Sequence, residues 1–237
     1  MAQEATPHPV KANQTIEIRT IGIPPYGIAL APGAVDASGI YYDVANLLAA
    51  GAGYTANNII YPYARIVSEL KSGKTDLSIM FKYAELDGYV TYVAPLPSLK
   101  TVIVGLKGSV YHSVDDLQGK TLAYLRGAKF SDKIDSSPLI HKRLSEDFDQ
   151  GARMLLYGRV DAIIGPLPPI VSAIKASGEQ EGVLGEPLVV DERTPWVQIS
   201  NKSTARLGES DLKEIFAKLV ARGDLSAIQE KYGVFHE

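Results

Sequence analysis

The sequence predicts an α/β protein made of two similar lobes, each a sheet flanked by helices. The main observation is an internal repeat, because residues 73–82 (Gly-Lys-Thr-Asp-Leu-Ser-Ile-Met-Phe-Lys) return from position 158 as Gly-Arg-Val-Asp-Ala-Ile-Ile-Gly. Each copy combines a helix-ending glycine, a turn with a basic residue and an aspartate, and a short apolar strand. Proline-rich segments at 94–97 and 166–169 then stop each strand. Two such units predict two facing sheets with a crevice between them, unless a common helix-to-strand turn recurs by chance.

Composition excludes several classes of protein. The 237 residues are 46% hydrophobic, enough to bury a core in one large or two small domains. The formal net charge of −3 gives no basic face for nucleic acid and no polybasic membrane tether. The absence of cysteine excludes disulfides and thiol catalysis and fits an oxidising compartment. No stretch approaches the ~18 apolar residues of a membrane helix. Residues 1–14 are expected to be a disordered lead-in with a processed start.

The first elements are predicted from the alternation of apolar and polar residues and from turn residues. Apolar and polar residues alternate over 15–21, which predicts a strand that stops at Pro24-Pro25. Asp43 is the expected N-cap of a helix that ends near Gly51. Residues 51–56 superficially match a dinucleotide fingerprint, but that motif must follow a strand, and here it follows a helix.

Further strands and helices are predicted along the rest of the chain. Strands are predicted at 58–61, 76–81, 101–105, 120–125, 141–146, 161–164, 189–190 and 196–199. Helices are predicted after Pro62, before Gly158, after Pro168-Pro169, and twice after Asp211. Residues 113–116 form a capping pattern before the strand at 120.

Candidate ligand-binding residues follow predicted strand ends, where open α/β sheets place ligands. Cationic groups there could bind a carboxylate, sulfonate or phosphate of a ligand. Aromatic rings, including Trp196, could stack on a flat or apolar part of the ligand. The segment 126–129 is expected to combine a cation with the free amides of a helix start. The alternatives are solvent-exposed charges and core aromatics. The candidates are Tyr26, Tyr63, Arg65, Phe81, Lys82, Arg126, Gly127, Ala128, Lys129 and Pro166.

The sequence predicts no catalytic group, cofactor or metal. The four histidines lack metal-ligand spacing, and no Gly-x-Ser-x-Gly nucleophile motif occurs. Asp43 and Glu85 are the only acids that suggest general acid or base chemistry, and a helix cap or a helix-start charge explains each more simply.

The order of short motifs over about residues 15–235 resembles the family 3 extracytoplasmic solute-binding proteins of ABC importers. None of the motifs is specific alone, but seven occur in the right order. They are residues 24–26 (Pro-Pro-Tyr), 39–44 (Gly-Ile-Tyr-Tyr-Asp-Val), 70–76 (Leu-Lys-Ser-Gly-Lys-Thr-Asp), 92–95 (Tyr-Val-Ala-Pro), 116–122 (Asp-Leu-Gln-Gly-Lys-Thr-Leu), 158–162 (Gly-Arg-Val-Asp-Ala) and 228–233 (Ile-Gln-Glu-Lys-Tyr-Gly).

The resemblance implies a two-lobed periplasmic-binding-protein-like fold with a ligand cleft between the lobes. Residues 15–96 plus 200–237 would form one lobe and 101–195 the other, with crossings near 96–101 and 195–200. It also implies a bacterial periplasmic monomer, whose signal peptide this sequence lacks, that delivers a small-molecule solute to the membrane permease of an ABC importer. The alternatives are an enzyme like the periplasmic cyclohexadienyl dehydratases and a ligand-sensing module for a membrane receptor.

The family's ligand residues carry over unevenly. Tyr26 and Tyr63 match aromatic positions. Members that bind α-amino acids carry an arginine for the carboxylate where this chain has Leu86, and an aspartate for the ammonium where it has Pro166. Where many members have serine or threonine at the second-lobe turn, residues 128–129 are alanine and lysine. The resemblance therefore implies a small polar, anionic solute rather than a standard α-amino acid.

Overall fold

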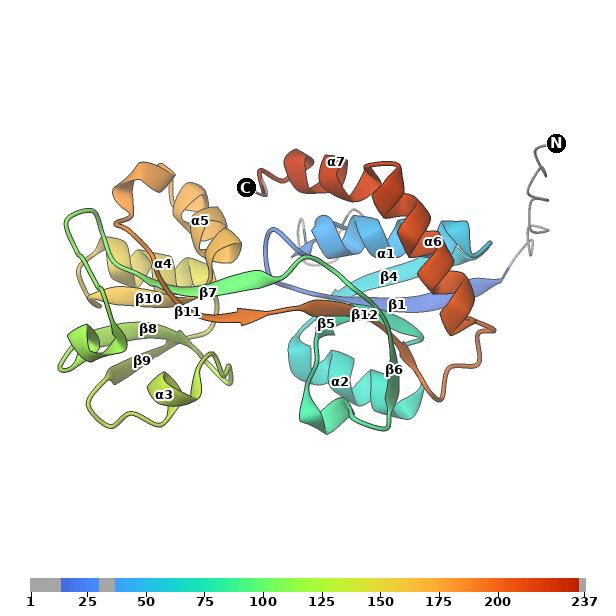
Figure 1. Ribbon diagram of the computed structural model, residues 1–237, viewed down its shortest axis with the longest axis horizontal. Helices are drawn as coiled ribbons and strands as arrows, with labels where there is room; N and C mark the ends of the chain where they lie inside the picture. The colour runs from blue at the N-terminus through green and yellow to red at the C-terminus, as the bar shows by residue number, and fades with distance from the viewer. Residues whose placement is uncertain (1–13, 30–36, 235–237) are drawn as a thin grey trace. The chain divides into compact units, whose positions relative to one another are not determined.

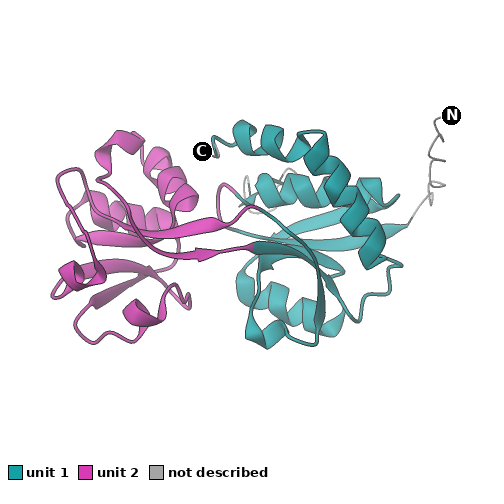
Figure 2. Ribbon diagram, viewed as in Figure 1, with its two compact units in different colours: residues 1–22, 26–96, 195–237 teal, residues 23–25, 97–194 magenta. Residues whose placement is uncertain are grey.

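The computed structural model describes residues 14–29 and 37–234, and these form two compact units. The first unit comprises the described parts of residues 1–22, 26–96 and 195–237, and the second comprises residues 23–25 and 97–194 (Figure 2). The first unit is therefore built from separate stretches of chain.

The first unit contains a five-stranded sheet in the order β4-β1-β5-β12-β6 (Figure 1). β1 runs parallel to both β4 and β5, whereas β12 is antiparallel to both β5 and β6. β12, the last strand in the sequence, thus lies between two strands from the first hundred residues. The strands are β1 (Thr15–Ile21), β4 (Thr55–Tyr61), β5 (Leu77–Phe81), β6 (Val90–Pro95) and β12 (Pro195–Ser200).

The second unit contains a five-stranded sheet in the order β11-β7-β10-β8-β9. β8 is parallel to β9 and β10, and β7 is antiparallel to β10 and β11. Both sheets therefore have three adjacent parallel strands followed by one antiparallel strand and one further strand. The strands are β7 (Leu99–Val104), β8 (Thr121–Leu125), β9 (His141–Ser145), β10 (Ala162–Pro166) and β11 (Leu188–Arg193).

Helices pack on both sheets. The first unit has α1 (Ile40–Gly51), α2 (Tyr63–Ser72), the 3-10 turn η1 (Ala84–Leu86), α6 (Glu209–Ala221) and α7 (Asp224–Lys231), with a short ribbon of β2 (Ile28–Ala29) and β3 (Ala37–Ser38). The second unit has η2 (Val114–Leu117), α3 (Asp132–Asp135), α4 (Phe148–Leu156), α5 (Leu167–Ala176) and η3 (Glu181–Val183).

Helix α2 shows how the sequence pattern becomes packing. Ile66, Val67 and Leu70 recur on one face and are buried in a small apolar cluster with Met80 of β5. Gly73 ends the helix in the left-handed conformation, φ 81°, which a glycine adopts without steric cost. The second unit has its own apolar cluster, so each sheet is covered by its own helices.

The C-terminal helices pack within the first unit. Leu212, Phe216 and Leu219 of α6 are buried, as is Leu225 of α7. Both helices contact α1, and α6 also contacts β6.

One predicted helix start was wrong. Asp43 does not cap α1, because the helix begins at Ile40 after Gly39. Asp43 lies in the first turn, where its carboxylate accepts hydrogen bonds from Lys231 Nζ at 2.8 Å and Tyr232 Oη at 2.9 Å. The expected disordered lead-in falls almost entirely outside the described residues. The capping pattern at 113–116 is confirmed as a capping box of Ser113 and Asp116.

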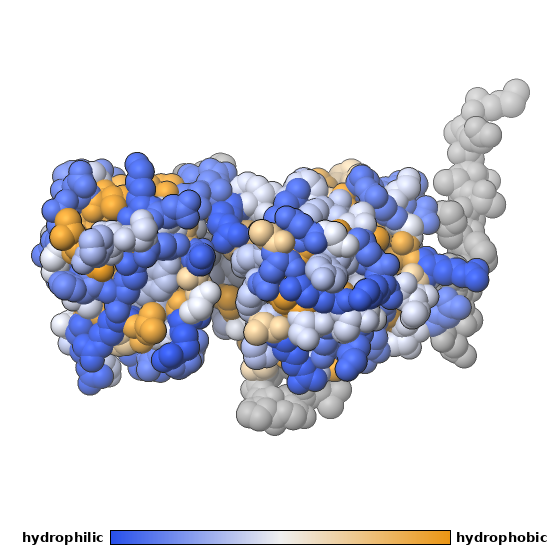
Figure 3. All heavy atoms as spheres, turned by 90° about the horizontal axis from the view of Figure 1, so that it is seen from below, coloured by the Kyte–Doolittle hydropathy of each residue, from blue (hydrophilic) through white to orange (hydrophobic). Residues whose placement is uncertain are grey.

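The surface seen in Figure 3 is mainly hydrophilic, with hydrophobic residues in small separate groups. The exposed large apolar side chains include Val110, Leu139 and Tyr157, which come from different elements. Within the described ranges, every helix is too short or too polar to span a bilayer.

Candidate functional site

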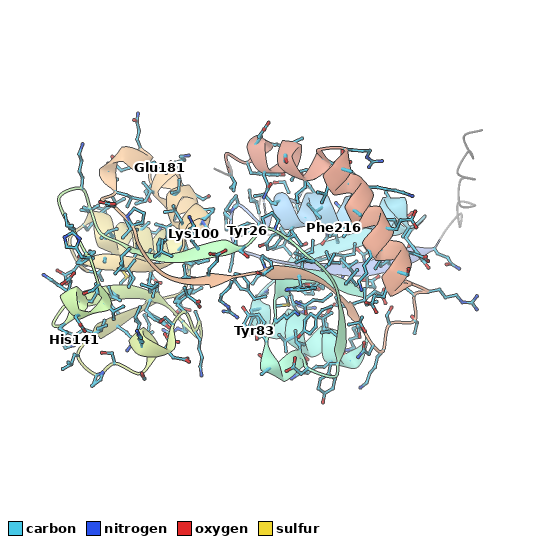
Figure 4. All side chains as sticks on the ribbon, in the orientation of Figure 1. Tyr26, Tyr83, Lys100, His141, Glu181 and Phe216 are labelled. Atoms are coloured by element: carbon cyan, nitrogen blue, oxygen red, sulfur yellow. The ribbon has the colours of Figure 1, made fainter. Side chains whose placement is uncertain are left out.

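Each unit brings the ends of three parallel strands to one edge of its sheet. In the first unit these are the carboxyl ends of β1, β4 and β5, and in the second those of β8, β9 and β10. Loops at such an edge carry the ligand groups of open α/β sheets. The predicted candidates lie at or just after these strand ends (Figure 4 labels Tyr26).

Tyr26, in the loop after β1, is a buried ring. It stacks on Tyr41 with 4.4 Å between ring centroids and is only 5% exposed. Its backbone carbonyl accepts the amide of Tyr41 at 3.0 Å, which ties the loop to the start of α1. Burial raises the pKa of the Tyr26 hydroxyl above its ordinary value, so the group stays protonated. Within the described part of the chain this hydroxyl is buried without a hydrogen-bond partner. A role of Tyr26 in covering a ligand stays a prediction.

Tyr63 and Arg65 lie in the first turn of α2. The Tyr63 hydroxyl donates to the Glu85 carboxylate, and its ring tilts against Tyr83 with 4.7 Å between centroids. The Arg65 guanidinium lies 3.6 Å from the centre of the Tyr61 ring and pairs with a carboxylate of its own helix. Arg65 therefore already contacts a ring of β4 and a carboxylate of α2.

Phe81 and Lys82 follow directly from β5. The Lys82 ammonium lies 3.7 Å from the centre of the Trp196 ring and 4.6 Å from that of Tyr92, both within cation–π range. Pro195 lies opposite Phe81 and has no amide hydrogen to donate. The Gln198 side chain instead donates to the Phe81 carbonyl at 3.1 Å.

The expected helix start after β8 was wrong. Gly127 has φ 76° and forms a turn in which the Ala128 amide donates to Leu125, and α3 begins only at Asp132 and is four residues long. A left-handed residue so close to the strand interrupts the helix, so residues 127–129 present no set of free helix amides.

Arg126 and Lys129 lie on the exposed face of this turn. The Arg126 side chain pairs with Glu146 at 2.8 Å, and its amide donates to the Ser145 carbonyl at 2.8 Å. The Lys129 carbonyl accepts from Arg193 at 3.3 Å. The charge predicted at this edge is present, but Arg126 has a carboxylate partner.

The two positions matched to the amino-acid clamp carry no polar side chain. Leu86 is fully buried in the apolar cluster beneath α2. Pro166 is buried at the end of β10 and precedes α5. Neither position offers a charged group.

Sequence reasoning missed the tyrosines that surround the end of β5. Tyr61, Tyr83 and Tyr92 are half-buried and pack around the same apolar cluster. Their signal was present, because Tyr61 and Tyr83 lie at the end of or just after predicted strands, but an aromatic at a strand end is more often core. Gln198 was also missed, because its role depends on pairing with β5.

Two surface pockets of the second unit lie away from these residues. One of about 400 Å³ lies between Leu106, Tyr111, Lys120 and Asp161 of the second unit, before the amino ends of β8 and β10. Another of about 330 Å³ lies at the carboxyl ends of α4 and α5. Neither includes a predicted candidate. The described residues contain no group of three or more histidines and acids suited to a metal ion.

Comparison with known families identifies the chain. The family model described as "Bacterial extracellular solute-binding proteins, family 3" matches residues 19–235. The chain belongs to this family. The expected family and fold class are thereby confirmed. Members of this extracytoplasmic family bind small-molecule solutes and work with the permeases of ABC transporters.

One curated relative matches this family 3 protein at low identity. The probable amino-acid-binding protein YxeM of Bacillus subtilis (strain 168) is 26% identical over 178 residues, which cover 72% of this chain and 66% of YxeM. The match thus spans just under two thirds of that relative.

Solved structures share the fold at low identity. The ligand-binding core of GluR0 in complex with L-glutamate has a TM-score of 0.76 at 15% identity, covering 93% of this chain and 99% of that one. An ABC uptake substrate-binding protein from Streptococcus pneumoniae with bound histidine has a TM-score of 0.75 at 19% identity, covering 92% of each chain. At these identities the likeness establishes the fold alone.

Proposed function

We propose that this family 3 protein binds a small anionic organic solute, without converting it, and delivers it to the permease of an ABC importer in the periplasm. Its family membership supports solute binding. We also propose that the two units are lobes that close on the solute and that the protein acts as a monomer.

Ordinary L-α-amino acids are excluded from this proposal, and the two clamp positions carry the argument. A buried ammonium without a partner costs several kcal/mol after relaxation. Leu86 offers no donor for a carboxylate and Pro166 no acceptor for an ammonium. The Phe81 carbonyl, a further acceptor at the end of β5, already accepts from Gln198. An amino acid would therefore leave both its charges poorly paired at these positions.

The amino-acid names of the relatives do not weaken this proposal. YxeM is only 26% identical, and the solved structures are more distant. Recognition depends on single charged side chains, which change faster than the fold that carries them. The proposal therefore follows the residues of this chain.

Binding is favoured over catalysis by the positions of the two candidate acids. Asp43 accepts from Lys231 and Tyr232, and Glu85 accepts from Tyr63. A general acid must reach a reacting group of the substrate. Both carboxylates serve protein contacts instead.

A ligand screen tests the proposal. Thermal shift followed by calorimetry with L-amino acids, organic acids and sulfonates should give at least one anion that binds about 100-fold more tightly than any standard L-amino acid, a difference of roughly 2.7 kcal/mol. Low-micromolar binding of a standard L-amino acid, with the other classes silent, would contradict it. Mass spectrometry of solute released from the denatured protein gives an independent identification.

A further inference from the structure

The first unit carries an aromatic rim around the end of β5. Four tyrosines pack against the apolar cluster beneath α2, and Trp196 lies opposite Met80 of that cluster, on the same face of the sheet. All five rings are half-buried, so each keeps some surface exposed. The second unit contains only Tyr111, Tyr124 and Tyr157 of the chain's 13 tyrosines, and the single tryptophan belongs to the first unit. The rim comprises Tyr61, Tyr63, Tyr83, Tyr92 and Trp196.

Cations of the protein already lie over the faces of this rim. Lys82 contacts Trp196 and Tyr92 at 3.7 and 4.6 Å, and Arg65 lies over Tyr61 at 3.6 Å. A cationic solute, such as a quaternary ammonium, would have to compete with these groups for the same electron-rich faces. The two side chains therefore disfavour a cationic solute at these ring faces, and the Lys82 ammonium offers an anion a partner there.

Two of the four tyrosine hydroxyls of the rim are directed to carboxylates of the protein. Tyr63 Oη donates to Glu85, and Tyr92 Oη donates to Asp87 at 3.2 Å. These bonds fix the two rings and occupy their donors. At these two tyrosines a solute thus meets ring surface rather than a free hydroxyl donor, which favours a flat aromatic partner in offset or edge-to-face contact.

We propose that the solute is a planar aromatic anion, an arenecarboxylate or arenesulfonate, whose ring packs on the rim and whose anionic group pairs with Lys82. This inference rests on the proposed function, and it names the solute class and one residue that determines specificity. Lys82 suits the role because its two ring contacts hold the ammonium at the rim. An ammonium is a compact charge that can approach an anion from several directions.

Calorimetry on the full chain tests the solute class. The probes are benzoate, 4-hydroxybenzoate, phenylacetate and benzenesulfonate, with cyclohexanecarboxylate as the non-planar control and glycine betaine as the cationic control. We expect at least one aromatic anion to bind at least 10-fold more tightly than both controls. Its binding should also change the fluorescence of Trp196, the only tryptophan and a member of the rim.

Two variants and a matched control test Lys82. Lys82→Met keeps the length and removes the charge, and should weaken aromatic-anion binding at least 10-fold. Lys82→Arg keeps the charge and should stay within about 3-fold of the wild type. Lys74→Met alters an exposed lysine at the amino end of β5 and should leave affinity unchanged.

The possible failures are distinguishable. Silence of all four aromatic anions while cyclohexanecarboxylate or another non-aromatic organic acid binds would overturn the inference and leave the proposed function standing. Unchanged affinity in Lys82→Met would overturn the role of Lys82. Tight binding confined to standard L-amino acids would overturn the inference and the proposed function together.

Discussion

The turn before β5 in the first unit and the turn before β10 in the second are held by the same hydrogen bonds. Asp76 Oδ2 accepts the Glu17 amide at 2.8 Å, and the Asp76 amide donates to the Glu17 carbonyl at 2.8 Å. Asp161 makes the same pair with Thr121, also at 2.8 Å in each direction. The repeated aspartate therefore has one physical role in both units, which is to join the turn to the neighbouring parallel strand.

The strand registers show which residues correspond. Ile18 lies opposite Leu77 in the first sheet, and Leu122 lies opposite Ala162 in the second. The next residues along β1 and β8 are then equivalent, so Arg19 corresponds to Ala123.

The interiors beneath the two turns are chemically different. In the first unit Arg19 is 7% exposed and its Nε lies 3.0 Å from Glu69 Oε2. Glu69 of α2 corresponds to Met154 of α4, because each carbonyl accepts the amide that follows the helix-ending glycine. Ala123 and Met154 belong to one apolar cluster. The second unit thus has apolar packing where the first has a buried ion pair.

The comparison shows that the hydrogen bonds of the turn recur in both units, whereas the side-chain packing beneath the turn differs. The amide and carbonyl groups at the turn must be paired wherever this connection occurs, so the aspartate recurs. The space between strand and helix can hold either an ion pair or apolar side chains of similar volume, because a buried pair often contributes no more than well-packed apolar groups.

The largest expected effect comes from breaking the ion pair on one side. Glu69→Ala should destabilise the first unit by about 3 kcal/mol, because it removes one of the carboxylate partners of the buried Arg19. Arg19 then keeps Glu17, which is 2.7 Å away and whose side chain is 37% exposed. The double variant Arg19→Met/Glu69→Met imitates the second unit and should recover most of the loss. Urea unfolding followed by the fluorescence of Trp196, which lies in the first unit, measures both.

Acid pH provides a control for this pair. Burial alone would raise the pKa of Glu69, but hydrogen bonds from Arg65, Thr75 and Arg19 outweigh it and hold the pKa below its ordinary value of 4.5. The stabilisation is then fully present above pH 4.5 and is lost as the pH falls through the lower folded-state pKa. The difference between wild type and Glu69→Ala should shrink in that range. A difference that stays constant down to pH 2 would show that the ion pair is not its source.

A smaller and unequal effect is expected from the repeated aspartates. Asp76 is 6% exposed and also accepts from Ser203 at 2.6 Å, whereas the Asp161 side chain is 43% exposed. Asp76→Ala should cost about 2–3 kcal/mol and Asp161→Ala about 1 kcal/mol or less. Hydrogen exchange should show faster exchange of the Glu17 and Thr121 amides, respectively. Equal losses would mean that burial does not set the strength of these bonds.

The smallest effect is expected from the exposed pair at the end of β8. Arg126 and Glu146 are 60% and 64% exposed, so solvent screens their attraction. Arg126→Ala should change the unfolding free energy by less than about 0.5 kcal/mol, measured by far-UV circular dichroism because Trp196 reports on the other unit. A loss above 1 kcal/mol would contradict this assignment.

The sequence by itself determined the local elements. Alternation over 15–21, the helical spacing of Ile66, Val67 and Leu70, and the glycines at 73 and 158 predicted strand, helix and turn where they occur. These features arise from neighbouring residues, whose conformational preferences and hydrogen bonds act over a few positions of the chain. The candidate residues at strand ends were predictable for the same reason.

Tertiary structure decided what those candidates contact. Burial of the Tyr26 ring, the pairing of Arg19 with Glu69 and the turn at Gly127 depended on neighbours that the local pattern did not specify. Trp196 lies over Lys82 because β12 is inserted between β5 and β6, more than a hundred residues away in sequence. Such contacts follow from strand order and packing, which many residues determine jointly, and no local sequence pattern encodes them.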